Sequence, residues 1–267
     1  MLASRYFIDL TQPEISAQLK KNPLVILPQG SVEQHGPHLP TGTDIFASNV
    51  IAHAVAERMD GLVLPGGPLG VTPLHMPFEG TITLSPDTYM RVVKETCASM
   101  ANHGAKYLLI LNWHEMNIPP LAVAADLLHR EHGMTVLTVQ ACFVAEDMFG
   151  KECGGLTHGG EIEALAVLAY RPDLVHLERI DYSSDHAHGH KVDALRRTRS
   201  YQPVLTDVRS IAPTGWYGSP QHATVEKAEK MIHTVADSIA KQSAEIFKQL
   251  DRIQGGTAEI RQLDKVR

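Results

Sequence analysis

Four short runs of strand character divide this chain, and segments of helical character follow them. The runs cover residues 24–27, 62–64, 106–111 and 135–141. Residues 106–111 are a continuous apolar stretch, which indicates a strand buried on both faces, as in a parallel sheet. Strands that alternate with helices predict an open α/β sheet, and ligands bind such sheets at the carboxyl ends of the strands. We therefore expect an α/β domain with a mostly parallel sheet flanked by helices.

The helices are expected between and after these strands, over residues 11–20, 45–59, 86–103, 119–132, 161–170 and 223–250. Residues 65–80 are rich in glycine and proline and are interpreted as a loop that lines a pocket or a subunit contact. Residues 144–157 are predicted to form a glycine-bearing loop. The expected organisation is one domain over residues 1–250 and a polar tail over 251–267.

The composition excludes several classes of protein. The chain has 267 residues, 43% of them hydrophobic, which is enough for one large core. Its net charge is −6, so there is no basic surplus for binding nucleic acid or an anionic membrane. No apolar run approaches the roughly 20 residues of a membrane-spanning helix. The three scattered cysteines are typical of free thiols, and we expect a cytoplasmic protein.

The loop over residues 28–44 concentrates metal-binding side chains directly after the first strand. Glu33 and His35 are two residues apart, so in extended backbone they point to the same side. Asp44 can close a site from the far end of the loop, just before the helix. Carboxylate oxygen and imidazole nitrogen together suit zinc, manganese or iron. A polar surface loop with an N-cap aspartate is the alternative interpretation.

Two further segments carry the same kinds of side chain. His114 follows the strand at 106–111, so it can meet the first loop at the same edge of the sheet. His158 precedes a helix whose first turn holds Glu161 and Glu163. Acidic residues are favourable at a helix start, which is the preferred interpretation of Glu161. A histidine is well suited to general acid–base chemistry because its ordinary pKa lies near neutrality.

Residues 30–44, Gly-Ser-Val-Glu-Gln-His-Gly-Pro-His-Leu-Pro-Thr-Gly-Thr-Asp, resemble the signature of the creatininase (creatinine amidohydrolase) family. Residues 80–84 and 158–163 resemble further segments of that family, and the likeness extends from about residue 20 to 240. It implies a creatininase-like fold, a small-molecule substrate and a homo-oligomer, with a hexamer as the family's assembly.

The resemblance also implies a site with two divalent metal ions, zinc, manganese or iron. Glu33, Asp44 and His114 would hold one ion. Asp44 would bridge to the second, which His35 and Glu163 would also hold. The implied mechanism is attack by a metal-bridging hydroxide on a carbonyl held by the second metal, with His158 protonating the leaving group.

The chain departs from the family where Trp113, Glu115 and Met116 flank His114. Many members have Asn-Gly-His-Gly-Gly-Asn there, and creatininase has Tyr-Glu after the histidine, with the glutamate serving the metal site. The tryptophans that enclose creatinine also lack counterparts, so creatinine itself is not the expected substrate. Trp113 and Glu115 favour a hydroxylated or amino-bearing substrate, and Glu115 is predicted to orient water or substrate.

These observations predict a metal-dependent hydrolase of a non-peptide C–N bond, in a cyclic amide or a formamide. One alternative is hydrolytic C–C cleavage of a cyclic diketone derived from inositol. A second is a peptidase of a cofactor precursor, and a third is a non-catalytic metabolite-binding protein on the same fold. Three alternating histidines, His186, His188 and His190, are interpreted as part of a solvated loop.

Overall fold

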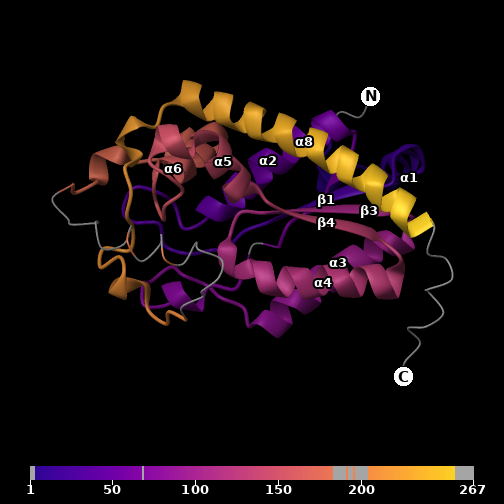
Figure 1. The fold of residues 1–267 in the computed structure, drawn as a ribbon, viewed down its shortest axis with the longest axis horizontal. Helices are drawn as coiled ribbons and strands as arrows, with labels where there is room; N and C mark the ends of the chain where they lie inside the picture. The colour runs from indigo at the N-terminus through magenta and orange to yellow at the C-terminus, as the bar shows by residue number, and fades with distance from the viewer. Residues whose placement is uncertain (1–3, 68, 183–190, 192–194, 196–203, 256–267) are drawn as a thin grey trace.

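A parallel sheet of four strands forms the centre of the computed structural model, which describes residues 4–67, 69–182, 191, 195 and 204–255 (Figure 1). The strands lie in the order β2 (Leu62–Val63), β1 (Leu24–Gln29), β3 (Tyr107–Asn112) and β4 (Thr135–Gln140). All three pairs of neighbours are parallel. The α/β fold with a parallel sheet is therefore as predicted. The three histidines at 186, 188 and 190 lie outside the described residues.

The strand register brings three strand ends to one edge of the sheet. Gln29 at the end of β1 pairs with Asn112 at the end of β3, and Asn112 pairs with Gln140 at the end of β4. The loops that follow β1 and β3 therefore leave the sheet side by side. This is the edge at which open α/β sheets bind ligands.

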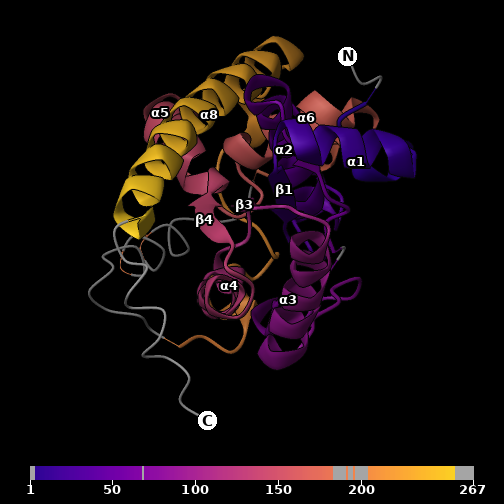
Figure 2. The ribbon, with the colours of Figure 1, turned by 90° about the vertical axis from the view of Figure 1, so that its right-hand side faces the viewer.

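Helices cover both faces of the sheet, and residues 24–27 of β1 and 108–111 of β3 are apolar and buried between them. Ile26 packs into one core cluster with α2 (Thr43–Met59), α5 (Ala141–Cys153), α6 (Glu161–Tyr170) and α8 (Val225–Gly255). The neighbouring Val25 packs into a second cluster with α1 (Gln12–Lys21), α3 (Pro86–Asn102) and α4 (Ile118–His132). Figures 1 and 2 show α3 and α4 on one side of the sheet and α5 and α8 on the other.

The prediction of a loop over residues 144–157 is wrong, because most of this segment belongs to helix α5. Cys142, Ala145, Phe149 and Cys153 are buried on one side of that helix at spacings of three to four residues. The glycines predicted a loop over the whole segment, but they mark the helix end: Gly154 is the C-cap in the left-handed conformation.

Two other boundaries differ from the sequence prediction. Asp44 lies inside the first turn of α2, whose N-cap is Gly42, rather than in the loop before the helix. Helix α8 continues to Gly255, past its predicted end near residue 250. The separate tail stays a prediction, since residues 256–267 lie outside the described part of the chain. Over the described residues, no helix is both long and apolar enough to cross a membrane.

Candidate metal centre

Side chains from four segments converge beyond the carboxyl edge of the sheet. Glu33 and His35 come from the loop after β1, and Asp44 comes from the first turn of α2. His114 follows β3, and Glu163 lies in the first turn of α6. All five residues are at most 7% exposed. Every metal-ligand residue predicted from the sequence is therefore in one buried cluster, whereas their role as ligands stays a prediction.

Asp44 lies between two imidazoles and presents a different oxygen to each. Its Oδ2 is 3.1 Å from His114 Nδ1, and its Oδ1 is 3.4 Å from His35 Nε2. Glu33 Oε2 is 3.3 Å from His114 Nδ1, and Glu163 Oε2 is 3.5 Å from His35 Nε2. In each of two groups of residues, the potential ligand atoms lie within 4.8 Å of one another. One group is Glu33, Asp44 and His114, and the other is His35, Asp44 and Glu163. The geometry thus contains two adjoining sets that share Asp44.

Backbone carbonyls orient both imidazoles toward the carboxylates. His35 Nδ1 donates to the carbonyl oxygen of Glu33 at 3.1 Å, and His114 Nε2 donates to that of Val71 at 3.0 Å. In the neutral form that a metal ligand must take, the remaining nitrogen of each ring therefore carries a lone pair that faces the carboxylates. Metal-binding histidines characteristically use the second ring nitrogen in this way. His35 Nε2, moreover, is buried and has no hydrogen-bond partner among the described residues.

The electrostatics of the cluster indicate a shortage of positive charge. Across the described residues, the ion-pair partners of Glu33, Asp44 and Glu163 are all histidines. Burial lowers the pKa of His35, but the charges of Glu163 and Asp44 outweigh it and raise that pKa to about 10. Burial raises the pKa of Glu163 to about 7. Divalent cations fit this donor set, because they would neutralise the buried carboxylates and accept the histidine lone pairs.

Hydroxyl and amide side chains that the sequence analysis missed hold the ligands in place. Ser31 Oγ lies 2.8 Å from Glu33 Oε2 and 2.6 Å from Asp44 Oδ2, and Thr72 Oγ1 also donates to Glu33. Asn117 donates to Gly30 O at 2.9 Å and accepts from Val71 N at 2.9 Å, which ties three loops together. Such residues have no local sequence signal, since their role depends on contacts across the fold.

A glycine allows the first loop to pass against the start of α2. A Cβ atom at Gly30 would lie 2.5 Å from the backbone carbonyl carbon of Asp44. We expect Gly30→Ala to shift Asp44 and weaken metal binding by about ten- to a hundredfold, as loss of supporting residues typically does. Gly67→Ala is the matched control, because its Cβ would meet nothing within 4 Å. Metal titration of both variants tests this, and equal affinities would contradict it.

Three imidazoles stack beside the cluster. The ring of His158 lies 4.3 Å, between centroids, from the rings of both His35 and His75. His158 Nε2 donates to the carbonyl oxygen of Gln34 at 2.7 Å, so its Nδ1 carries the lone pair and lies 3.8 Å from Glu33 Oε1. Burial and the neighbouring His35 hold the pKa of His158 well below its ordinary value. His158 thus presents a neutral ring nitrogen that can accept a hydrogen bond or a proton toward the cluster.

His75 presents an N–H group toward the cluster, where His158 presents a nitrogen without a proton. The sequence prediction of site residues did not include His75. The Gln34 amide nitrogen lies 3.0 Å from His75 Nδ1 and 2.6 Å from the carbonyl oxygen of Gly215. Because the amide donates to both of these acceptors, His75 Nδ1 carries no proton. The ring proton is therefore on Nε2, which lies 3.7 Å from Glu33 Oε1. The signal that could have found it is its place in residues 65–80, which were predicted to line a pocket.

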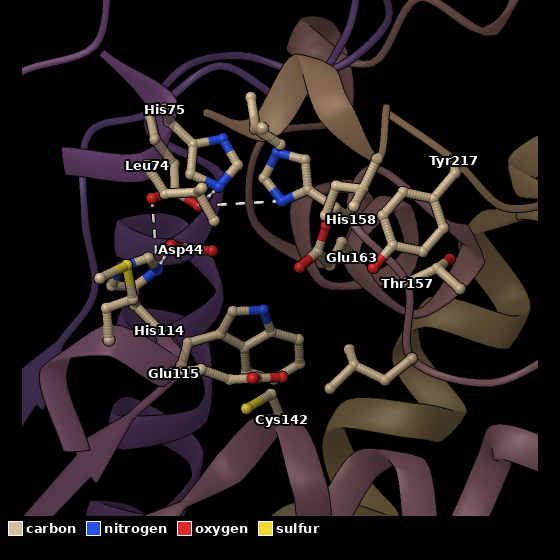
Figure 3. A pocket seen from close by; sticks show the side chains of 16 residues that line it. Asp44, Leu74, His75, His114, Glu115, Cys142, Thr157, His158, Glu163 and Tyr217 are labelled. Carbon is tan, nitrogen blue, oxygen red and sulfur yellow. Dashed lines mark ion pairs between the residues drawn. The ribbon is translucent and has the colours of Figure 1, made fainter. Parts of the chain in front are cut away.

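The cluster opens into a pocket of about 600 Å³, counting its mouth. Figure 3 shows Asp44, His75, His158 and Glu163 toward one end of this pocket, and Glu115 and Cys142 toward the other. Glu115 therefore lines the pocket as the sequence predicted, although its role stays a prediction. Glu161 lies outside the pocket lining and pairs with Lys227 Nζ at 2.9 Å.

Comparison with known proteins identifies the family. The family model named Creatininase, described as creatinine amidohydrolase, matches residues 8–242. The chain belongs to the creatininase family. Creatinine amidohydrolase of Pseudomonas putida is 29% identical over 92% of this chain and 99% of its own length. Mycofactocin precursor peptide peptidase of Mycobacterium ulcerans (strain Agy99) is 27% identical, over 86% of this chain and 88% of its own.

A further relative carries the name of a hydrolase of a different compound. It is 3-dehydro-scyllo-inosose hydrolase of Thermotoga maritima, 28% identical over 65% of this chain and 58% of its own length. A crystal structure of creatininase matches with a TM-score of 0.79 and 26% identity, over 92% of this chain and 99% of that one. Creatininase structures described as Zn-Zn type and as Mn also match. The chain is thus a creatininase-family hydrolase of the metal-dependent amidohydrolase type.

Proposed function

We propose that this creatininase-family hydrolase uses two divalent metal ions to cleave a non-peptide C–N bond in a small cyclic amide or a formamide. The observation that carries the proposal is the position of Asp44 between His35 and His114, each of which turns a ring nitrogen toward it. A carboxylate shared by two ligand sets is suited to bridging a metal pair. Zinc and manganese are the metals favoured, because structures of creatininase carry them.

Each residue of the cluster has a defined task in this proposal. Glu33, Asp44 and His114 would hold one ion, and His35, Asp44 and Glu163 the other. Such a pair lowers the pKa of water and polarises a carbonyl. Ser31 and Thr72 keep the carboxylates oriented through their hydroxyl groups.

His158 is the proposed acid–base residue. Its Nδ1 is available as an acceptor because Nε2 is engaged by the Gln34 carbonyl. The ring can therefore take a proton at Nδ1 and return it from the same atom to the leaving nitrogen. Glu115, which lines the pocket away from this ring, is proposed to orient the substrate.

A substitution of His158 separates proton transfer from metal binding. We expect His158→Gln to lower kcat by about 10²- to 10⁴-fold, the usual contribution of general acid–base catalysis, while two ions per chain remain bound. The assay panel contains lactams, formamides, cyclic ketones and peptides, with metal content measured on the same samples. Loss of an ion would make His158 a ligand instead. Turnover confined to cyclic ketones or to peptides would replace the C–N proposal with one of those alternatives.

The homo-oligomer and the cytoplasmic location expected from the sequence stay predictions. Exposed apolar side chains in and near the loop at 65–80 support an assembly. Met76 is 50% exposed and Ile82 is 51% exposed. Apolar patches on a surface favour contacts between proteins. We therefore retain a homo-oligomer, with a hexamer as the expected form, in the proposal.

A further inference from the structure

The pocket contains a buried hydrogen-bond donor that the described residues leave unused. Trp113 is 2% exposed and lines the pocket, and its Nε1 has no hydrogen-bond partner in the described part of the chain. A buried donor without a partner costs on the order of 1–3 kcal/mol, and the large majority of buried side-chain polar atoms have a hydrogen-bond partner. The ring also belongs to an apolar core cluster. Because phenylalanine would supply apolar packing without this cost, the N–H group is better explained by a ligand.

The backbone on both sides of the tryptophan is held rigidly. Trp113 N donates to the carbonyl oxygen of Gln29 at 2.9 Å. The side chain of Asn112 donates to His114 O at 2.5 Å and to Gln140 Oε1 at 2.6 Å. Since His114 belongs to the metal centre and is the next residue, the indole is fixed relative to that centre. Fixed donors of this kind bind a ligand without a further ordering cost.

The charges around the pocket restrict the acceptor that this donor can bind. Among the described residues, the lining includes the four carboxylates of Glu33, Asp44, Glu115 and Glu163 and contains neither lysine nor arginine. Two divalent ions and the three ligand carboxylates would together carry one net positive charge. The carboxylate of Glu115 offsets that charge. A carboxylated substrate would therefore find no lysine or arginine to pair with among the described lining residues. An amino group is also unsuitable for the indole, because an ammonium and an indole N–H both only donate.

We propose that Trp113 is a substrate-recognition residue whose indole N–H binds an uncharged oxygen, hydroxyl or carbonyl, on the part of the substrate beyond the cleaved bond. This inference rests on the proposed function, which places the cleaved bond at the metal centre. It narrows the substrate class to neutral, oxygen-bearing small amides. Of the hydroxylated and amino-bearing substrates that the sequence left open, it selects the hydroxylated class for this position.

The two tryptophans of the chain provide a matched pair of variants. Trp216 lines a separate hollow, so Trp216→Phe controls for Trp113→Phe. Calorimetry on the metal-loaded protein would measure binding of butyrolactam, ring-hydroxylated butyrolactams and pyroglutamate. We expect a hydroxylated lactam to bind about three- to tenfold more tightly than butyrolactam, as one added hydrogen bond provides, and pyroglutamate to bind most weakly. The hydroxyl preference should disappear in Trp113→Phe and persist in Trp216→Phe.

Fluorescence gives a second measurement that does not depend on the folding of Trp113→Phe. In Trp216→Phe, all tryptophan emission comes from Trp113, and a bound hydroxylated lactam should shift it. The inference is overturned by an unchanged preference in Trp113→Phe, by unmoved emission, by preferred binding of pyroglutamate, or by no saturable binding of the neutral lactams. Hydrolysis of the same compounds tests the proposed function separately, because the binding preference does not require turnover.

Discussion

Asp44→Asn is expected to remove metal from both sets of ligands and to lower kcat/KM on the order of a thousandfold or more. The carboxylate of Asp44 faces His35 with one oxygen and His114 with the other. Asparagine keeps the shape but replaces one oxygen with a donor group and removes the charge, so neither ion retains its shared ligand. The rate falls because metal-bound water has a pKa of about 7 and free water one of about 15.7.

Asp126→Asn is the matched control for that variant. Asp126 is an exposed residue that pairs with Arg130 on the surface of α4, and such pairs contribute about 0–1 kcal/mol. Its replacement should leave metal content and kcat/KM unchanged. Circular dichroism on both variants excludes a general loss of fold. An Asp44→Asn protein that keeps two ions per chain and wild-type turnover would refute the role of Asp44 as the shared ligand.

Chelation of the metals is expected to abolish turnover and to destabilise the protein. The buried carboxylates would lose their counter-ions, and the inward-facing histidine nitrogens would lose the ions they bind. A bound ion at a hundred times its Kd stabilises the native state by about 2.7 kcal/mol, so removal should lower Tm by several degrees. Addition of zinc or manganese should restore both properties in the wild type. Dialysed protein whose metal content is verified as negligible, but whose turnover is unimpaired, would exclude metal catalysis.

The sheet and the convergence of the ligands could be predicted because both follow from local patterns. The apolar run that ends at Asn112 predicts a buried strand, and parallel strands end at a common edge. This is enough to bring His114 to the loop that holds Glu33 and His35. Helix α5 was missed because Gly150 and Gly154 outweighed an apolar period that runs through the same segment.

Features that depend on three-dimensional partners could not be predicted. His75 becomes part of the site through the Gln34 amide and the His158 ring, both distant in sequence. That Trp113 Nε1 has no hydrogen-bond partner among the described residues is likewise visible only in the folded structure. The resemblance in sequence marks Trp113 as an expected departure from the family, but it cannot indicate whether the N–H group is used by the fold.

Anomalous X-ray diffraction from crystals of the zinc- or manganese-loaded protein tests the metal centre most directly. We predict two ions per chain that share Asp44, with Glu33 and His114 on one and His35 and Glu163 on the other. A single ion, or ions bound away from Asp44, in an enzyme that is fully active would contradict the two-metal site.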